Sequence, residues 1–407
     1  MAATACRALL RHTPRGTAPS CPVWRQNNTP ALLYEMPQRA FGSTALSTQE
    51  YPAPRAGVPW QEFGFSLTTR ETRMVIARCS AGRRWESCSS EPYGPLSLEP
   101  SATVLNYGQS IFEGSKAYRT ERGRIVLFRP SKNAQRMANG ARRLMMPAVP
   151  TDLYLEACSM AVRENADWVP PVGKGALYLR PLLFGSGADL GVKPSSEYTF
   201  VVYVAPVGKY FGPGSGGARM KLEMEHQRAA PAGIGHVKAA GNYAQCFAAQ
   251  RDAKYDGFSD VIYLDVNGEY IEEAAASNFF CVDENKVIHT PQLGTILAGV
   301  TRDSVIQVVQ RMRDKDIRIK VGKVSVETVL SSKEAFLTGT GAGITPIEHI
   351  GTEDESVDFS CPGPVTQMIS DALSDIQLER TKDRFNWLHD PFYMPSVGYD
   401  SFREPTF

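Results

Sequence analysis

The chain has 407 residues, 43% of them hydrophobic, and a formal net charge of +1. A chain of this length and composition can bury more than one core, and its balanced charge shows no bias toward nucleic acid or an acidic surface. No apolar run approaches the roughly 18 to 20 residues of a membrane helix. The eight cysteines form no close-spaced pattern for a disulfide or a metal, so we expect reduced thiols and no metal site.

Residues 1–48 have the composition of a transit peptide. They contain many Ser, Thr and Ala residues, five arginines, no lysine, and Glu35 as the only acid. The run Arg39-Ala-Phe-Gly-Ser-Thr resembles the context of a matrix-protease cleavage site, which favours the mitochondrial matrix. The Ser and Thr content keeps a plastid destination open. A disordered regulatory arm is the alternative, and the scarcity of acids argues against it.

The rest of the chain is predicted to form two domains of mixed helices and strands, an α/β (α+β) fold. A small α+β domain is expected over residues 55–207 and a large domain over residues 218–400, joined by the glycine-rich linker 208–217. The elements predicted in the small domain are a hairpin around Glu121–Gly123, helices beginning near Ser131 and Thr151, and strands at 175–184 and 197–205.

Lys238 lies in a segment that suits a pocket better than a solvated surface. Glycines at 233, 235 and 241 allow the backbone to approach a ligand closely, and Tyr243 supplies a nearby phenol. A desolvated lysine can present a neutral amine that attacks an aldehyde and forms a Schiff base, for which pyridoxal phosphate is the candidate cofactor. A lysine beside glycines is more often an ordinary loop residue, so this hypothesis depends on the rest of the chain.

Two carboxylates, Glu272 and Glu273, are predicted to end a strand of the hairpin that Asn267 and Gly268 turn. The apolar residues that follow carry at least one carboxylate into the interior. There it requires a cationic partner, such as a protonated pyridine nitrogen. The alternative is a pair of solvated acids at a strand end, and it fits Glu272 better than Glu273.

Two segments are candidates for binding a phosphate group. Gly299-Val300-Thr301 opens a predicted helix whose apolar residues, at positions 305, 306, 308, 309 and 312, fit one face. Free amides at the start of a helix bind phosphate, and the helix dipole assists them. The second segment, Thr338–Thr345, is a glycine-rich turn that could offer hydroxyls and amides, and it also fits an ordinary tight loop.

Ordered motifs between Leu105 and Pro346 resemble the branched-chain amino acid aminotransferases of the fold type IV pyridoxal-phosphate enzymes. The matching motifs are Asn106–Gly114, Leu127–Pro130, Ala176–Pro181, Gly235–Lys238, Gly241–Tyr243, Glu273 with Ser277–Asn278, Gly299–Arg302 and Thr338–Thr340. The resemblance implies a two-domain fold of the D-amino acid aminotransferase-like kind, pyridoxal 5'-phosphate as cofactor, and a homodimer.

The resemblance also implies a role for each matching cofactor residue. Lys238 would be the catalytic Schiff-base lysine, Tyr243 would hydrogen-bond the phenolic oxygen of the cofactor, and Glu273 would keep its pyridine nitrogen protonated. The residues implied for the phosphate are Arg136 through its guanidinium, Val300 and Thr301 through their amides, and Thr340 through its hydroxyl.

Substrate binding is implied in the same way. The residues concerned are Tyr107, Phe112, Tyr178, Arg180, Thr340 and Gly341. The aromatic residues would form the wall for the side chains of leucine, isoleucine and valine, and the backbone of Thr340 and Gly341 would bind the α-carboxylate. Arg180 lies two residues after Tyr178, hence on the same strand face, and would pair with the second carboxylate of glutamate or 2-oxoglutarate. By itself, this pair also fits a strand with one wet face.

These assignments predict reversible transfer of the amino group from leucine, isoleucine or valine to 2-oxoglutarate by a ping-pong route, with no nucleic-acid or membrane partner. Within the same fold, D-amino acid aminotransferase and aminodeoxychorismate lyase are the alternative enzymes. The pair Tyr178 and Arg180 argues against both. A non-catalytic member that binds cofactor as a scaffold is a third alternative, which the complete set of cofactor residues disfavours.

Overall fold

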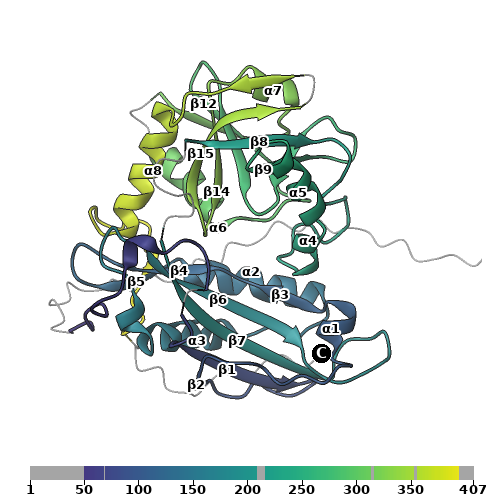
Figure 1. Cartoon of the computed structure of the whole chain (residues 1–407), viewed down its shortest axis with the longest axis vertical. Helices are drawn as coiled ribbons and strands as arrows, with labels where there is room; N and C mark the ends of the chain where they lie inside the picture. The colour runs from purple at the N-terminus through teal and green to yellow at the C-terminus, as the bar shows by residue number, and fades with distance from the viewer. Residues whose placement is uncertain (1–49, 68, 209–215, 313–315, 353–354, 394–407) are drawn as a thin grey trace, which may run out of the picture. The chain divides into compact units, whose positions relative to one another are not determined.

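The computed structural model describes residues 50–393, except positions 68, 209–215, 313–315 and 353–354. The predicted transit peptide, residues 1–48, and most of the predicted linker, 208–217, lie outside the described residues. Residues Glu50–Phe407 group as one compact unit, which contains two sheets (Figure 1).

The first sheet is antiparallel throughout, with the order β17-β5-β4-β6-β7-β1-β2 and with β3 also paired to β6. Its strands are β1 (Arg73–Ser80), β2 (Ser89–Pro92), β3 (Ser110–Phe112), β4 (Ser115–Arg119), β5 (Ile125–Phe128), β6 (Ala176–Gly185), β7 (Glu197–Val207) and β17 (Leu388–His389). The helices in this part of the chain are α1 (Thr103–Tyr107), α2 (Pro130–Arg143), α3 (Thr151–Arg163) and two short 3-10 helices, η1 (Trp60–Glu62) and η2 (Ala166–Trp168).

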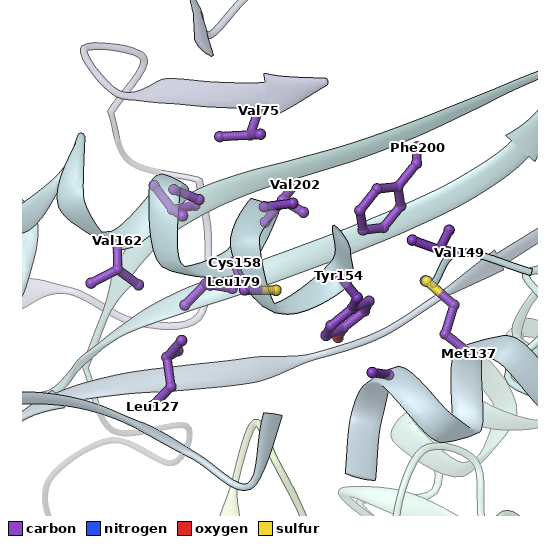
Figure 2. Close-up of a cluster of buried hydrophobic side chains, with 14 of the residues drawn as sticks. Val75, Leu127, Met137, Val149, Tyr154, Cys158, Val162, Leu179, Phe200 and Val202 are labelled. Atoms are coloured by element: carbon purple, nitrogen blue, oxygen red, sulfur yellow. The ribbon is translucent and has the colours of Figure 1, made fainter. Parts of the chain in front are cut away.

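The predicted hairpin and helix starts of this half agree with the structure. Gly123 turns β4 into β5 at φ 79°, a conformation that glycine adopts without strain, and Thr120 donates its amide to the Arg124 carbonyl at 2.8 Å. Helices α2 and α3 bury an apolar face against the sheet. Figure 2 shows this core, in which Tyr154 of α3 stacks on Phe200 of β7 at a ring distance of 5.8 Å.

The second sheet is mixed, with the order β10-β9-β8-β15-β14-β11-β12-β13. Because β10 also pairs with β11, the path from β10 through β14 to β11 closes on itself, and β16 pairs with β15. The strands are β8 (Ala218–Glu223), β9 (Asp260–Leu264), β10 (Ile271–Ala274), β11 (Asn278–Val282), β12 (Val287–Pro291), β13 (Arg318–Gly322), β14 (Glu334–Gly339), β15 (Gly343–Gly351) and β16 (Ser356–Asp358). The helices are α4 (Gly241–Ala244), α5 (Phe247–Tyr255), α6 (Val300–Arg311), α7 (Val326–Leu330) and α8 (Pro364–Gln377). This mixture of helices with antiparallel and mixed sheets confirms the predicted fold class.

The C-terminal segment departs from the predicted division of the chain. Strand β17, which falls within the span predicted for the second domain, pairs with β5 of the first sheet. Trp387 is buried against Phe128, with ring centroids 5.6 Å apart, and the guanidinium of Arg129 lies 4.4 Å from the Trp387 ring. The segment that contains Trp387 and β17 is therefore attached to the first sheet.

Candidate active site

Lys238 is fixed to the first sheet by its backbone, although it follows β8 in sequence. Its carbonyl accepts the amide of Phe112 at 3.1 Å, and the amide of Ala240 donates to the Ser110 carbonyl at 3.1 Å. The partly buried side chain donates Nζ to Tyr243 Oη at 3.0 Å and lies 4.7 Å from the centroid of the Phe112 ring. The amine is therefore held between two aromatic residues.

Glu273 is 2% exposed, as predicted, and its carboxylate is bound by polar groups. Arg228 Nη1 lies 2.6 Å from Oε1, the Leu297 amide donates to Oε1 at 3.0 Å, and Asn278 Nδ2 donates to Oε2 at 2.9 Å. Burial raises the pKa of Glu273 to about 7, against the opposing charge of Arg228. This carboxyl group is poised between its neutral and charged forms near neutral pH.

Arg228 is a site residue that the sequence reasoning missed. Its side chain is buried, donates Nη1 to the Gly235 carbonyl at 3.3 Å, and lies 5.8 Å from the Tyr243 ring centroid. A buried carboxylate requires a nearby cation, and Arg228 precedes the lysine segment by only a few residues. That requirement was the signal in the sequence that could have identified it.

Glu272 is buried as well, so the solvated alternative applies to neither glutamate. Its side chain is 7% exposed and accepts a hydrogen bond from the hydroxyl of Thr295, and burial raises its pKa. The register of β10 against β9 shifts between Ile271 and Ala274. Such an irregularity breaks the alternation of side chains, so that two consecutive glutamates are both enclosed.

The two segments predicted for phosphate binding lie on one cavity. The amides of Val300 and Thr301 open α6, where no carbonyl of a preceding helical turn can accept them. Thr340 lies in the turn between β14 and β15. The cavity encloses about 350 Å³, counting its opening to solvent. Its lining comes from both sheets and comprises Gly114, Ser115, Lys116, Tyr118, Phe128, Asn133, Val300, Thr301, Gly339, Thr340, Gly343 and Gln377.

Arg136 extends from α2 to the segment before α6. Its Nη1 donates to the Ala298 carbonyl at 2.9 Å, while Nε and Nη2 contact the two carboxylate oxygens of Glu113 at 2.7 and 2.6 Å. Glu113 is completely buried and also accepts Asn133 Nδ2 at 2.8 Å. The sequence reasoning missed Glu113, which compensates the charge of Arg136 within the protein.

Three of the predicted substrate residues lie together. Arg180 Nη2 donates to Tyr178 Oη at 3.2 Å, and its guanidinium carbon lies 4.8 Å from the Phe112 ring centroid. A Cβ at Gly114 would collide with the Tyr178 hydroxyl, so this glycine permits the position of the phenol. The pairing of an aromatic wall with one guanidinium, next to Lys238, provides apolar and cationic surface in a single site.

Tyr107 is placed differently. It lies on α1, is 42% exposed, and donates its hydroxyl to the Leu190 carbonyl at 2.5 Å. Within the described residues, no hydrogen bond or ring contact joins it to Phe112, Tyr178 or Arg180. Helix α1 and the loop around Leu190 carry the side chain away from this cluster.

The same described residues contain no cluster of His, Cys, Asp and Glu side chains suited to a metal. They also include no helix with the length and apolar character needed to cross a bilayer.

The sequence matches known proteins over most of its length. Residues 110–350 match the model of the amino-transferase class IV family. The chain is 39% identical to branched-chain amino acid aminotransferase 1, mitochondrial, of Humulus lupulus, over 90% of this chain and 92% of the relative. It is 42% identical to branched-chain amino acid aminotransferase 2, chloroplastic, of the same species, over 85% of this chain and 84% of the relative.

A solved structure agrees with these relatives. The branched-chain amino acid aminotransferase from Escherichia coli superposes with a TM-score of 0.64 at 28% identity. The match covers 75% of this chain and 97% of that one. The chain therefore belongs to the pyridoxal-phosphate-dependent class IV aminotransferases and, within them, to the branched-chain amino acid aminotransferases.

Proposed function

We propose that the protein transfers the amino group of leucine, isoleucine or valine to 2-oxoglutarate, giving branched-chain 2-oxo acids and glutamate. The observation that carries the proposal is the group of Lys238, Phe112, Tyr178 and Arg180, which combines an amine, apolar rings and a cation. Both substrate classes, one apolar and one anionic, find a complementary surface there.

The residues fit pyridoxal 5'-phosphate. Bound in the site, the cofactor supplies an aldehyde that takes up the amino group and a ring that accepts negative charge from the α-carbon. Lys238 Nζ would form the bond to it, and Tyr243, already hydrogen-bonded to that amine, would contact its phenolic oxygen. Glu273 is the buried carboxylate available to the ring nitrogen. The amides of Val300 and Thr301 and the hydroxyl of Thr340 would hold the phosphate.

Each side chain then has a defined task in the reaction. Lys238 Nζ, freed by the incoming amine, would move the proton from the substrate α-carbon. Arg228 would keep Glu273 from becoming fully neutral, since its guanidinium opposes the effect of burial. Glu113 neutralises the charge of Arg136. Arg136 would therefore bind the phosphate mainly through hydrogen bonds from its N–H groups, and its net positive charge would contribute less.

Arg180 is proposed to discriminate between the substrates. A side-chain carboxylate cannot enter an apolar pocket unpaired, whereas a guanidinium beside Phe112 and Tyr178 can receive it. For leucine, the same aromatic rings would cover the isobutyl group. This arrangement supports one site that binds both glutamate and leucine, and not a separate site for each substrate.

The experiment is a steady-state substrate panel with L-leucine, L-isoleucine, L-valine, L-methionine and D-alanine as amino donors to 2-oxoglutarate. We expect parallel ping-pong lines and the highest kcat/KM for a branched-chain donor. In Arg180→Gln, KM for 2-oxoglutarate should rise about 10- to 100-fold and KM for leucine by much less. A preference for the D-amino acid, or an equal loss for both substrates, would contradict the assignment.

We further propose that residues 55–207 and 218–400 act as two domains joined by the linker 208–217. The cofactor would bind between the two domains, and β17 would belong to the first domain by its pairing with β5. The contact from Arg136 to Ala298 supports this division. Limited proteolysis should cut first near the linker, and cleavage first inside either sheet would contradict it.

A homodimer is proposed as well. Leu190 and Val192 are 83% and 87% exposed beside Tyr107, an apolar surface that a partner subunit would cover. The double variant Leu190→Asp, Val192→Asp should lower the mass measured by light scattering, and an unchanged mass would place the interface elsewhere.

For residues 1–48 we propose import into the mitochondrial matrix, with the plastid as the alternative that a chloroplastic relative keeps open. The composition of the segment supports an organellar address. A fluorescent protein carrying this segment should co-localise with a matrix marker, and plastid or cytosolic fluorescence would contradict the proposal.

A further inference from the structure

Arg129 is a buried arginine between β5 and α2. Its side chain is 3% exposed, and its backbone has φ 52° and ψ 41°. This is the left-handed region, which residues with a Cβ adopt only at a cost, so the surrounding contacts have to hold the residue there. Those contacts lie on α6 and on Trp387.

The guanidinium of Arg129 binds the first residues of α6. Its Nη1 donates to Ser304 Oγ at 2.7 Å and lies 3.5 Å from the carbonyl oxygen of Val300. The hydroxyl of Ser304 donates to the same Val300 carbonyl at 2.8 Å. Nη2 contacts Asp303 Oδ2 at 2.5 Å. Because the guanidinium is planar and rigid, these contacts together fix the position of the helix start.

Trp387 holds Arg129 through its backbone and through its ring. The Trp387 carbonyl accepts the amide of Arg129 at 2.8 Å, and the ring centroid lies 4.4 Å from the guanidinium carbon, a favourable cation–π distance. The ring also contacts Phe128 and Phe385, with centroids 5.6 and 4.0 Å away. The segment that contains β17 therefore fixes the arginine that binds α6.

The ion pair with Arg129 also removes a charge that opposes phosphate binding. The carboxylate of Asp303 lies in the first turn of α6, where the helix dipole attracts negative charge. Left unpaired, it would repel a phosphate at the amides of Val300 and Thr301 and compete with it for the same helix end. Arg129 compensates this carboxylate without adding a second negative group.

Two arginines hold the two sides of the helix start. Arg136 Nη1 donates to the Ala298 carbonyl, before the helix, at 2.9 Å, and Arg129 contacts Asp303 and Ser304 within the helix. Both arginines belong to the first half of the chain, on α2 or directly before it. The amides that open α6 lie between these two contacts, on the cavity described above.

We infer that Arg129 is a positioning residue for the phosphate group of the cofactor. It fixes the start of α6 so that the amides of Val300 and Thr301 are presented to the phosphate, and it compensates the charge of Asp303. Trp387 keeps the guanidinium in place, so the segment that contains β17 takes part in retaining the cofactor. This inference rests on the proposed function, which takes these two amides as phosphate donors.

The test compares how tightly the full-length protein retains pyridoxal 5'-phosphate and pyridoxal, which lacks the phosphate, by equilibrium dialysis of the two loaded forms. In Arg129→Met, affinity for pyridoxal 5'-phosphate should fall about 10- to 100-fold while affinity for pyridoxal changes little. Ser304→Ala removes one acceptor of the guanidinium and should lower the ratio of the two affinities about 3- to 10-fold. This milder variant decides the test if the methionine variant does not fold.

Arg311→Met is the matched control. Arg311 lies at the other end of α6, with its guanidinium carbon 4.0 Å from the Phe385 ring centroid, and its Nη1 donates to the Arg384 carbonyl at 3.1 Å. It therefore joins the same helix to the same C-terminal segment, but away from the amides that open the helix. The ratio of the two affinities should not change in this variant.

Two outcomes would overturn the inference. An equal loss of affinity for both ligands in Arg129→Met, or in Ser304→Ala, would make the arginine a residue of general stability only. An unchanged ratio in these variants would show that the start of α6 keeps its position without the guanidinium.

Val300→Pro tests the proposed phosphate site separately. Proline suits the first position of a helix and can follow the extended Gly299, but it removes the amide of that position. We expect the ratio of the two affinities to fall. An unchanged ratio would contradict the phosphate site itself, and the inference with it. A fall in Val300→Pro with none in Arg129→Met would contradict the inference alone.

Discussion

Glu272 and Glu273 show how differently two adjacent residues of one type can be used. Both are buried, but Glu273 is surrounded by an arginine, an amide side chain and a backbone N–H, while Glu272 has one hydroxyl and an oxygen, Oε2, without a partner in the described structure. The first environment can stabilise a charge. The second favours a protonated acid.

The raised pKa of Glu273 predicts that the stability of the apoenzyme depends on pH. The pKa of Glu273 rises from 4.5 to about 7 on folding, so the folded state holds a proton that the unfolded state has lost between these values. The unfolding free energy of the wild type, relative to Glu273→Gln, should therefore fall as pH rises through this window and level off above it. The expected change is on the order of 1 to 3 kcal/mol.

Urea unfolding of the two apoenzymes at several pH values between about 4.5 and 8 measures the effect, since this range brackets both pKa values. Lys254→Gln, a surface substitution away from the site, is the control. It shows whether changing the charge of any one residue alters the pH dependence of the unfolding free energy. A difference between wild type and Glu273→Gln that stays constant with pH would mean that the buried carboxyl keeps its ordinary pKa, because Arg228 outweighs burial.

At the residue scale, sequence reasoning identified the residues whose chemistry is visible in their type and local setting, such as Lys238 and Tyr243. It missed Arg228 and Glu113. Their importance arises from burial beside an opposite charge that is distant in sequence, as with the pair of Glu113 and Arg136. For Glu113 no local pattern encodes such a partner, whereas Arg228 could have been sought as the cation that a buried Glu273 requires.

At the scale of elements, the β3–β4 connection depends on Gly114. The residue leaves room for the Tyr178 phenol, and the preceding Glu113 is fully buried. Local signals predicted the hairpin at Gly123 and the starts of α2 and α3 well, because turn glycines and apolar periodicity act within a few residues. The closed path of the second sheet and the return of β17 to β5 depend on contacts far apart in the chain, which those signals do not contain.

Gly114→Ala should displace the Tyr178 hydroxyl and, with it, the guanidinium of Arg180. We expect KM for both leucine and glutamate to rise and the unfolding free energy to fall by about 1 to 3 kcal/mol. Gly322→Ala is the matched control, since a Cβ there meets no atom within 4 Å. Chemical denaturation and initial rates measure both effects, and indistinguishable results for the two variants would show that the phenol has room to move.

At the scale of the whole molecule, the site is assembled from two sheets. The backbone of Lys238 is tied to β3, Arg136 reaches Ala298, and Lys116 reaches Gly341. Each of these contacts joins the first sheet or its helix α2 to a segment that connects elements of the second half of the chain. A change in the relative position of the sheets would therefore alter the cofactor and substrate contacts together.

The most direct measurement of the central claim is the absorbance of the purified holoenzyme before and after L-leucine, compared with Lys238→Ala. The account predicts that leucine removes the visible band of the wild type and replaces it with that of the amine form. Lys238→Ala should retain cofactor through its phosphate contacts yet convert it at least about a hundredfold more slowly. Conversion at the wild-type rate in Lys238→Ala would show that another residue carries out the reaction.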